Sequence, residues 1–213
     1  MARGLESNAG MKEASCPGSI RRRAVRAALL GIVLANTLLA GIAHSAERAI
    51  PRLKGHVTAV IDGNTLTVQL ASGPVRLRLQ SIDAPEPDQA GGDEATATLR
   101  KLVAGRDVEV EITDQSAGRN RFVGIVYLGE VEINEVMVRQ GEAWADRRHM
   151  RRKDDAILCI YEEEARGLQR GFWALAVAER VPPWEWRQRK TRTSFTDYTD
   201  ETAANCLAAV GSR

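Results

Sequence analysis

Four short stretches of the chain, the first of them loosely, alternate between apolar and polar positions with a period of two, as half-buried β-strands do, and a fifth is a more continuous apolar run. In TLTVQL (65–70), for example, Leu66, Val68 and Leu70 share one face and the polar residues share the other. The remaining stretches are HVTAVI (56–61), VRLRLQ (75–80), VEVEI (108–112) and RFVGIVY (121–127). Turn sequences typical of hairpins, DGN and SGP, join the first three. The pattern therefore predicts five strands, of which the first three form successive hairpins.

Three further stretches, 93–103, 133–140 and 155–170, carry apolar residues at helical spacing. A glycine follows each of them, as it does at many helix C-termini. We expect the consecutive glutamates Glu162, Glu163 and Glu164 to lie on the solvated face of the third helix. Together these elements predict a mainly β fold with helices (α+β), namely a five-stranded Greek-key barrel of the OB type with three packed α-helices.

Both ends of the chain differ in composition from this domain. A basic stretch at 21–26 precedes the apolar run 27–43, and small residues in A-x-A-like order follow. We expect residues 1–46 to be a cleaved secretory signal peptide, the alternative being a membrane anchor through 27–43. Residues 47–176 would then form the folded domain. Residues 177–213 read as a polar C-terminal tail, in which Trp184 and Trp186 could dock on the domain.

The export signal changes the charge balance of the chain. It holds six of the 30 Lys and Arg residues and two of the 28 Asp and Glu residues, which leaves 24 basic and 26 acidic groups. The net charge of the remainder is therefore −2. Overall composition is then no argument for nucleic-acid binding, and any attraction for phosphate must come from local patches.

Two cysteines, Cys159 and Cys206, lie beyond the expected signal peptide. An exported protein meets an oxidising compartment, where these two residues could form a disulfide. The alternative is a buried Cys159 on a helix and a free Cys206 in the tail. The cysteine spacing does not indicate a zinc site.

Charged residues gather where the third strand ends. Arg78 lies on the polar face of that strand, and Asp83 and Glu86 follow it. A barrel could bring Asp62 and Asn64 of the first hairpin beside them. Oxygen ligands suit a hard cation such as Ca²⁺, and guanidinium groups bind phosphate bidentately. From the residues alone, the cluster is either a site for metal and phosphate or scattered surface charge.

The chain resembles the staphylococcal nuclease (thermonuclease) family over about residues 53–175. The resemblance rests on the order and spacing of VIDGNTLTV (60–68), RLQSIDAPEP (78–87), GRNRFVGIVY (118–127), INEVMVRQGEAW (133–144) and EARGLQRGFW (164–173). It implies an OB-type barrel with three helices. It also implies a Ca²⁺-dependent phosphodiesterase that cuts DNA and RNA.

The resemblance further implies roles for single residues. Arg78 and Arg121 match two phosphate-binding arginines, and Glu86 matches a glutamate that activates or orients the attacking water. Asp83 matches a calcium-binding aspartate, and Ala84 stands where a backbone carbonyl meets the ion. The implied catalytic residues are thus Arg78, Glu86 and Arg121, and the implied metal ligands are Asp83, Asn64 and the Ala84 carbonyl, with Asp62 as a further candidate.

Two departures from the family pattern bear on function. Asn64 stands where the family has a calcium-binding aspartate, so we expect weaker ion binding or a compensating role for Asp62. After RQG, where a family member stacks tyrosines on a base, this chain has the basic stretch WADRRHMRRK (144–153). The candidate substrate-binding residues are Arg119, Arg147, His149 and Arg151, with a solvated loop as the alternative.

The sequence thus predicts an exported, Ca²⁺-dependent nuclease-like phosphodiesterase that hydrolyses DNA or RNA, in the periplasm or secreted. The alternative is a non-catalytic module that binds nucleic acid or protein on the same barrel, with a metal site impaired at Asn64. Membrane contact is expected only through an uncleaved leader. No protein partner is evident, and we expect a monomer.

Overall fold

The computed structural model of the 213-residue chain describes residues 51–115, 121–150, 152–189, 191, 194–196, 198 and 201–211. The expected leader at 1–46 and the candidates Arg119 and Arg151 lie outside these residues. All the described elements belong to one compact unit. Within the described residues, no helix is long and apolar enough to cross a membrane.

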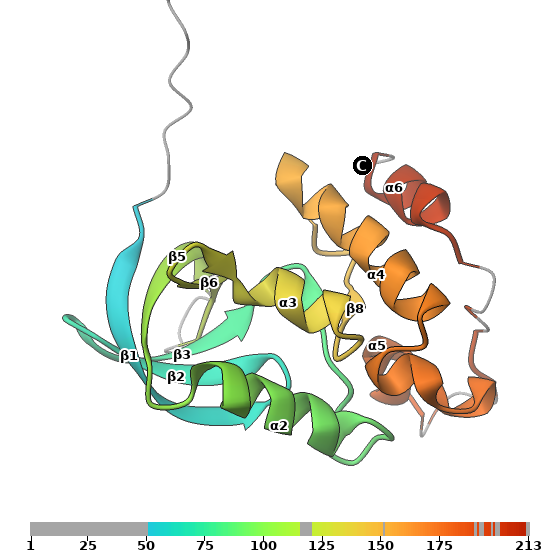
Figure 1. The fold of residues 1–213 in the computed structure, drawn as a ribbon, viewed down its shortest axis with the longest axis horizontal. Coiled ribbons are helices and arrows are strands. Elements are labelled where there is room, and N and C mark those ends of the chain that lie inside the picture. Colours follow the sequence, from blue (N-terminus) through green and yellow to red (C-terminus); the bar gives the residue numbers. More distant parts are fainter. Residues whose placement is uncertain are drawn as a thin grey trace, which may run out of the picture. The chain divides into compact units, whose positions relative to one another are not determined.

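The main sheet closes into a barrel (Figure 1). Its strands are β1 (Leu53–Asp62), β2 (Thr65–Leu70), β3 (Gly73–Leu79), β5 (Asp107–Gln115) and β6 (Arg121–Leu128), with the short β7 (Val131–Glu132) at one edge. Neighbouring strands follow the order β3-β2-β1-β5-β6-β7, and a parallel pairing of β3 with β6 closes the barrel. The five predicted strands and the OB-type barrel are therefore confirmed.

The alternating apolar and polar residues of the strands lie in the core and at the surface respectively. In β3, Val75, Leu77 and Leu79 are buried, whereas Arg76 is exposed and Arg78 is partly exposed. Burial of each such aliphatic side chain stabilises the barrel by about 1.5–3 kcal/mol. The same alternation directs Arg78 to the outer, polar face of the strand.

The three predicted helices are present as α2 (Gly92–Val103), α3 (Ile133–Arg139) and α4 (Ile157–Gly167), and the 3-10 turn η1 (Lys153–Ala156) precedes α4. Helix α2 packs on β1, and α3 packs between β6 and α4 (Figure 1). Asn134 fastens α3 to the barrel, because its side chain donates to the Gln80 carbonyl at 3.0 Å and accepts from the Val126 N–H at 3.2 Å. These contacts hold the helices against the strand ends that carry the charged cluster.

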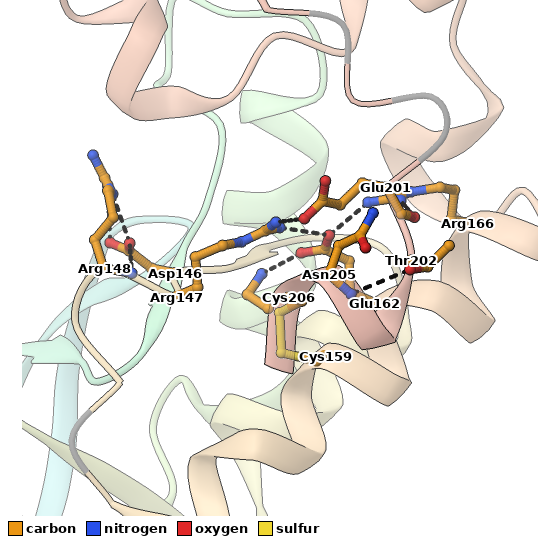
Figure 2. The surroundings of a disulfide bond; sticks show 11 residues. Asp146, Arg147, Arg148, Cys159, Glu162, Arg166, Glu201, Thr202, Asn205 and Cys206 are labelled. Carbon is orange, nitrogen blue, oxygen red and sulfur yellow. Dashed lines mark hydrogen bonds and ion pairs between the residues drawn. A yellow bond between two sulfur atoms is a disulfide. The ribbon is translucent and has the colours of Figure 1, made fainter. Parts of the chain in front are cut away.

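The stretch 177–213, expected to be a polar tail, contains further helical turns. After the 3-10 turn η2 (Gly171–Ala174) come η3 (Val177–Glu179), α5 (Pro183–Trp186) and α6 (Ala203–Gly211). Trp184 packs edge-on against Trp144, with ring centroids 5.7 Å apart. Helix α6 packs on α4, where Cys159 and Cys206 form a disulfide (Figure 2). Of the two interpretations of the cysteines, the structure has the disulfide.

Candidate active site

The hairpin between β1 and β2 brings Asp62 and Asn64 to the end of β3. Asn64 is buried, and its backbone N–H donates to Asp62 Oδ1 at 3.0 Å in a side-chain-supported turn. Gly63 lies between them because there is no room for a side chain: a Cβ there would lie 2.7 Å from the Cβ of Ala84. The hairpin therefore packs directly on the segment that carries Asp83.

A short ladder that the sequence did not reveal fixes Asp83. The two-residue strand β4 (Ile82–Asp83) pairs with β8 (Trp144–Ala145), and Asp83 lies opposite Trp144. The chain enters β4 through Ser81, which has a left-handed φ of 59°, and the Ser81 hydroxyl donates to Asp155 Oδ2 at 2.7 Å. The Asp83 side chain is only 1% exposed, so its charge requires partners inside the protein.

Three guanidinium groups surround the Asp83 carboxylate. Arg78 Nη2 lies 2.6 Å from Oδ1, Arg187 Nη2 lies 2.7 Å from Oδ2, and Arg148 Nη2 lies 3.6 Å from Oδ2. The Asn64 amide lies alongside, and in the orientation that satisfies its neighbours its oxygen accepts from Arg78 Nη2 at 3.1 Å. The structure thus gathers the predicted Arg78, Asp83 and Asn64, and adds two arginines to them.

The loop that carries Glu86 is fixed by its backbone, while its side chain remains accessible. The Gln89 N–H donates to the Glu86 carbonyl at 2.8 Å, and the Gln89 side chain accepts from the Glu86 N–H at 3.2 Å. At the start of α2, a Cβ on Gly92 would lie 2.0 Å from the Glu86 carbonyl oxygen, so only glycine lets the loop approach the helix this closely. The Glu86 side chain is 30% exposed, which suits a group that must meet a substrate or a water.

Arg121 lies on the same face of the barrel as Arg78. In the parallel pairing of β3 and β6, Arg121 lies opposite Arg76, and Val123 lies opposite Arg78. Alternate residues of a strand share a face, so Arg121 and Arg78 lie on the same side of the barrel, offset from each other by two residues along the strands. Arg121 is exposed. The two predicted phosphate-binding arginines therefore stand on neighbouring strands of one surface.

A pocket of about 320 Å³ opens beside this surface. Its lining includes Arg78, Val123, Asp146 and His149. His149 Nδ1 lies 2.7 Å from Asp146 Oδ2, and the His149 side chain is 63% exposed. Burial raises the pKa of Asp146, but hydrogen bonds from Arg148 and His149 outweigh burial and hold that pKa below its ordinary value. The pocket therefore adjoins the candidate phosphate site, with which it shares Arg78.

Arg147, a predicted substrate-binding residue, points away from this pocket. Its side chain is 10% exposed and pairs with Glu162 at 3.2 Å and with Glu201 (Figure 2). Such a buried, doubly paired guanidinium cannot reach a substrate without breaking both pairs, so the structure does not support the predicted role. The neighbouring Arg148 reaches Asp83 instead and stacks over Trp184, 4.2 Å from the ring centroid.

The prediction that Glu162 lies on a solvated helix face is wrong. Its side chain is 3% exposed and accepts from the Ala145 N–H at 2.7 Å and from Arg166 Nη2 at 2.6 Å, in addition to pairing with Arg147. Burial raises the pKa of Glu162, and the two guanidinium groups oppose that rise. The Glu162 carboxylate thus ties α4 to strand β8, which holds Asp83 in place.

The oxygen donors at this site are of the kind that a calcium ion takes: the Asp83 carboxylate, the Asn64 amide and the Ala84 carbonyl, with Asp62 adjoining. They fit the ion in chemistry. Among the described residues, however, no group of three or more His, Cys, Asp and Glu side chains is arranged to hold a metal ion. Only one of these donors, Asp83, is a carboxylate within the buried cluster, and guanidinium groups hold both its oxygens.

Sequence reasoning missed Arg187 altogether, and it included Arg148 only as part of a basic patch. Arg187 is 104 residues from Asp83 along the chain, and no local pattern links the two. The available signal was the segment PPWEWR (182–187), whose tryptophans were expected to dock on the domain.

Comparisons with known proteins bear on the same residues. A family model described as "Staphylococcal nuclease homologue" matches residues 76–175, a range that includes Arg78, Asp83, Glu86 and Arg121 and ends before Arg187. An "Uncharacterized endonuclease" of Escherichia coli O157:H7 is 38% identical over 139 residues, covering 65% of this chain and 87% of that protein. "Protein ParB" of Escherichia coli is 39% identical over 152 residues, covering 67% and 84%. "Micrococcal nuclease" of Shigella flexneri is 34% identical over 172 residues, covering 76% and 93%.

Proposed function

Because the chain belongs to the family of staphylococcal nuclease homologues, we propose that it is an exported, calcium-dependent phosphodiesterase that hydrolyses DNA, RNA or both. The family and the nuclease names of its relatives support a nuclease-type hydrolase with a nucleic-acid substrate.

One observation carries the proposal. Arg78 and the distant Arg187 converge on the buried Asp83 at the end of β3, Arg187 also contacts Glu86, and Arg78 lines a pocket of about 320 Å³. A pocket with convergent charged groups is the usual form of a catalytic site. A surface of scattered charge would not bury a carboxylate to 1% exposure and surround it with guanidinium groups.

Each residue has a distinct task in such a reaction. Glu86, accessible on its fixed loop, would hold a water molecule and take its proton as the water attacks phosphorus. Arg78 and Arg121 would bind the phosphoryl oxygens and neutralise the charge that grows on them in the transition state. Asp83, Asn64 and the Ala84 carbonyl would hold the calcium ion. When bound, that ion would supply Lewis-acid polarisation of a phosphoryl oxygen.

Export rests on the leader pattern and is supported by the disulfide. A Cys159–Cys206 disulfide persists in oxidising compartments and is rare in reducing ones. In the periplasm or outside the cell, the protein would meet external DNA or RNA and would have no access to the cell's own nucleic acid.

A binding module without catalysis is the second candidate, because two observations favour it. Asn64 removes a negative charge from the metal site, and guanidinium groups hold both oxygens of Asp83. Such a module would retain phosphate-binding arginines and lack turnover at any calcium concentration.

A nuclease assay across calcium concentrations separates the two candidates. We expect pure wild-type protein to cut DNA or RNA at high calcium, and Glu86→Gln to lower kcat by roughly 10²–10⁴-fold, because the proton acceptor is lost. Glu94→Gln, which changes an exposed glutamate on α2, is the matched control and should retain wild-type kcat. Complete inactivity of the wild type at every calcium concentration would favour the binding module.

Asn64→Asp tests the position of the metal site. The substitution restores a carboxylate beside Asp83, so the calcium concentration for half-maximal activity should fall, by roughly tenfold if one ligand charge is gained. A calcium dependence that is unchanged in Asn64→Asp would place the ion elsewhere.

A further inference from the structure

The segment after η3 (Val177–Glu179) runs along the loop that carries Asp83 and Glu86, and contacts at both of its ends hold it there. On one side, the Gln89 side chain donates to the Val181 carbonyl. On the other, Trp186 Nε1 donates to Asp88 Oδ1 at 2.9 Å, and Arg189 Nη2 lies 2.5 Å from Asp88 Oδ2. The segment is therefore docked on the site and does not merely pass it.

Glu185 holds the opposite side of this segment. It is 3% exposed and accepts from the Thr196 N–H at 2.8 Å and from the Tyr198 hydroxyl at 3.2 Å. Trp184 packs on Trp144, which lies opposite Asp83 in the β4–β8 ladder. Arg187 continues the turn, since its N–H donates to the Pro183 carbonyl at 3.0 Å. These contacts thus hold the backbone that carries Arg187 in addition to its guanidinium contacts.

The Arg187 guanidinium bridges the two carboxylates of the site. Its Nη2 lies 2.7 Å from Asp83 Oδ2, and its Nη1 lies 3.2 Å from Asp83 Oδ1 and 2.6 Å from Glu86 Oε1. Burial lowers the pKa of Arg187, but its contacts with Asp83 and Glu86 outweigh burial and raise that pKa above its ordinary value. The guanidinium is therefore a permanently charged cation that occupies both oxygens of Asp83.

A calcium ion would need the same oxygens. It binds carboxylate oxygens at about 2.3–2.6 Å, and guanidinium N–H groups already take lone pairs on both oxygens of Asp83, so the ion must displace them or share the oxygens with a like charge. Asn64 weakens the site further, because it supplies no negative charge to draw the ion in. Two cations of fixed charge beside one buried aspartate also repel each other.

We propose that Arg187 competes with calcium for Asp83 and Glu86, and so sets the calcium concentration at which the site fills. The proposal rests on the calcium-dependent function proposed above. Calcium binding releases the guanidinium from Asp83, while Trp184, Glu185 and Trp186 keep the segment nearby. At low calcium the site stays closed by its own arginine, and the carboxylate of Glu86 is unavailable to a water molecule.

The test is calcium binding to the pure full-length protein, measured by isothermal titration calorimetry without substrate. Arg187→Gln should bind calcium roughly tenfold or more tightly than wild type, because an adjacent arginine lowers the affinity of a carboxylate for a proton by one to three powers of ten and opposes a calcium ion by the same repulsion. Arg187→Lys, which keeps the charge but cannot bridge both carboxylates, should fall between them. Arg106→Gln is the matched control: Arg106 is an exposed arginine between α2 and β5, and its replacement should leave the affinity within about twofold of wild type.

Two further measurements test whether calcium binds at Asp83 and whether it releases Arg187. Asp83→Asn should abolish the calorimetric signal in both the wild-type and the Arg187→Gln backgrounds. In the wild type, hydrogen-exchange mass spectrometry should show faster exchange of the amides of residues 185–189 on addition of calcium. Thermal melts of each variant check that it is folded.

The outcomes separate this inference from the proposed function. If Arg187→Gln binds calcium no more tightly than wild type while Asp83→Asn abolishes binding, competition is wrong and the calcium site stands. If neither wild type nor Arg187→Gln binds calcium, the inference fails, and the nuclease assay in EDTA then decides whether the chain is a phosphodiesterase without calcium. Calcium binding by Arg187→Gln alone would support competition in its strongest form.

Discussion

At the scale of the residue, the Glu132 carboxyl stands out for its proton affinity. Glu132 lies on β7, opposite Tyr127 of β6. Burial, and then the neighbouring charge of Glu135, raise its pKa from 4.5 to about 7, against a smaller opposing effect of Arg152. Between about pH 4.5 and pH 7, the Glu132 carboxyl keeps its proton in the folded chain and has lost it in the unfolded chain. The contribution of Glu132 to stability is therefore full below about pH 4.5 and is lost as the pH rises through about 7.

Glu132→Gln removes this titration. At pH 8 the variant should be more stable than wild type by about 1–2 kcal/mol, a figure reduced for partial solvent screening, and near pH 4.5 the two should be similar. Denaturant unfolding at both pH values measures the difference. Glu130→Gln, on the exposed turn between β6 and β7, is the control. A difference between Glu132→Gln and wild type that is the same at both pH values would contradict the assignment.

Residue-scale prediction failed where one position decides the direction of a side chain. Arg147 and Arg148 adjoin, yet Arg147 enters the interior to meet Glu162, and Arg148 turns to Asp83. The two residues lie in the turn that follows β8, where neighbouring side chains leave the backbone in different directions. The basic stretch identified the patch, but only the folded turn determines which of its arginines reaches the site.

At the scale of the element, Glu162 joins α4 to β8. Its carboxylate pairs with Arg147 and Arg166 and accepts from the Ala145 N–H. Glu162→Gln should lower the free energy of unfolding by about 3–5 kcal/mol, since it removes the carboxylate partner of the buried Arg166 and one of the two carboxylate partners of Arg147. Because β8 pairs with β4, the variant should also loosen Asp83 and lower nuclease activity.

The matched control is Glu163→Gln, on the exposed face of the same helix. It should change stability by no more than about 0.5 kcal/mol. Guanidinium chloride unfolding, followed by circular dichroism, gives both values. A Glu162→Gln variant as stable as Glu163→Gln would show that the buried pairs contribute nothing to the native state.

The elements predicted from sequence were those with local signals. Strand β2 has the predicted bounds, because strict alternation between two turn sequences defines it. The β4–β8 ladder has two residues on each strand and joins positions about 60 residues apart, so no periodic pattern in the sequence predicts it. Helix α5 is equally short, and its docking depends on aromatic contacts with Trp144 that only the fold creates.

At the scale of the whole molecule, charge is local. The chain after residue 46 carries a net charge of −2, yet Arg78, Arg121 and Arg148 lie around one strand end. Two or three phosphate contacts predict that log KM for duplex DNA rises with log salt concentration at a slope of roughly 2–3. Initial rates between 50 and 200 mM salt at saturating calcium give this slope. A slope near 10 would require a far larger basic surface than these residues provide.

The Cys159–Cys206 disulfide has a consequence for how the chain responds to proteolysis. A protease that cuts once between Arg189 and Glu201 would leave the terminal peptide attached through sulfur. The nicked molecule would migrate as a single band on a non-reducing gel and as two bands after treatment with a thiol. Release of α6 would thus require both proteolysis and reduction of the disulfide, and the disulfide is not reduced in an oxidising environment.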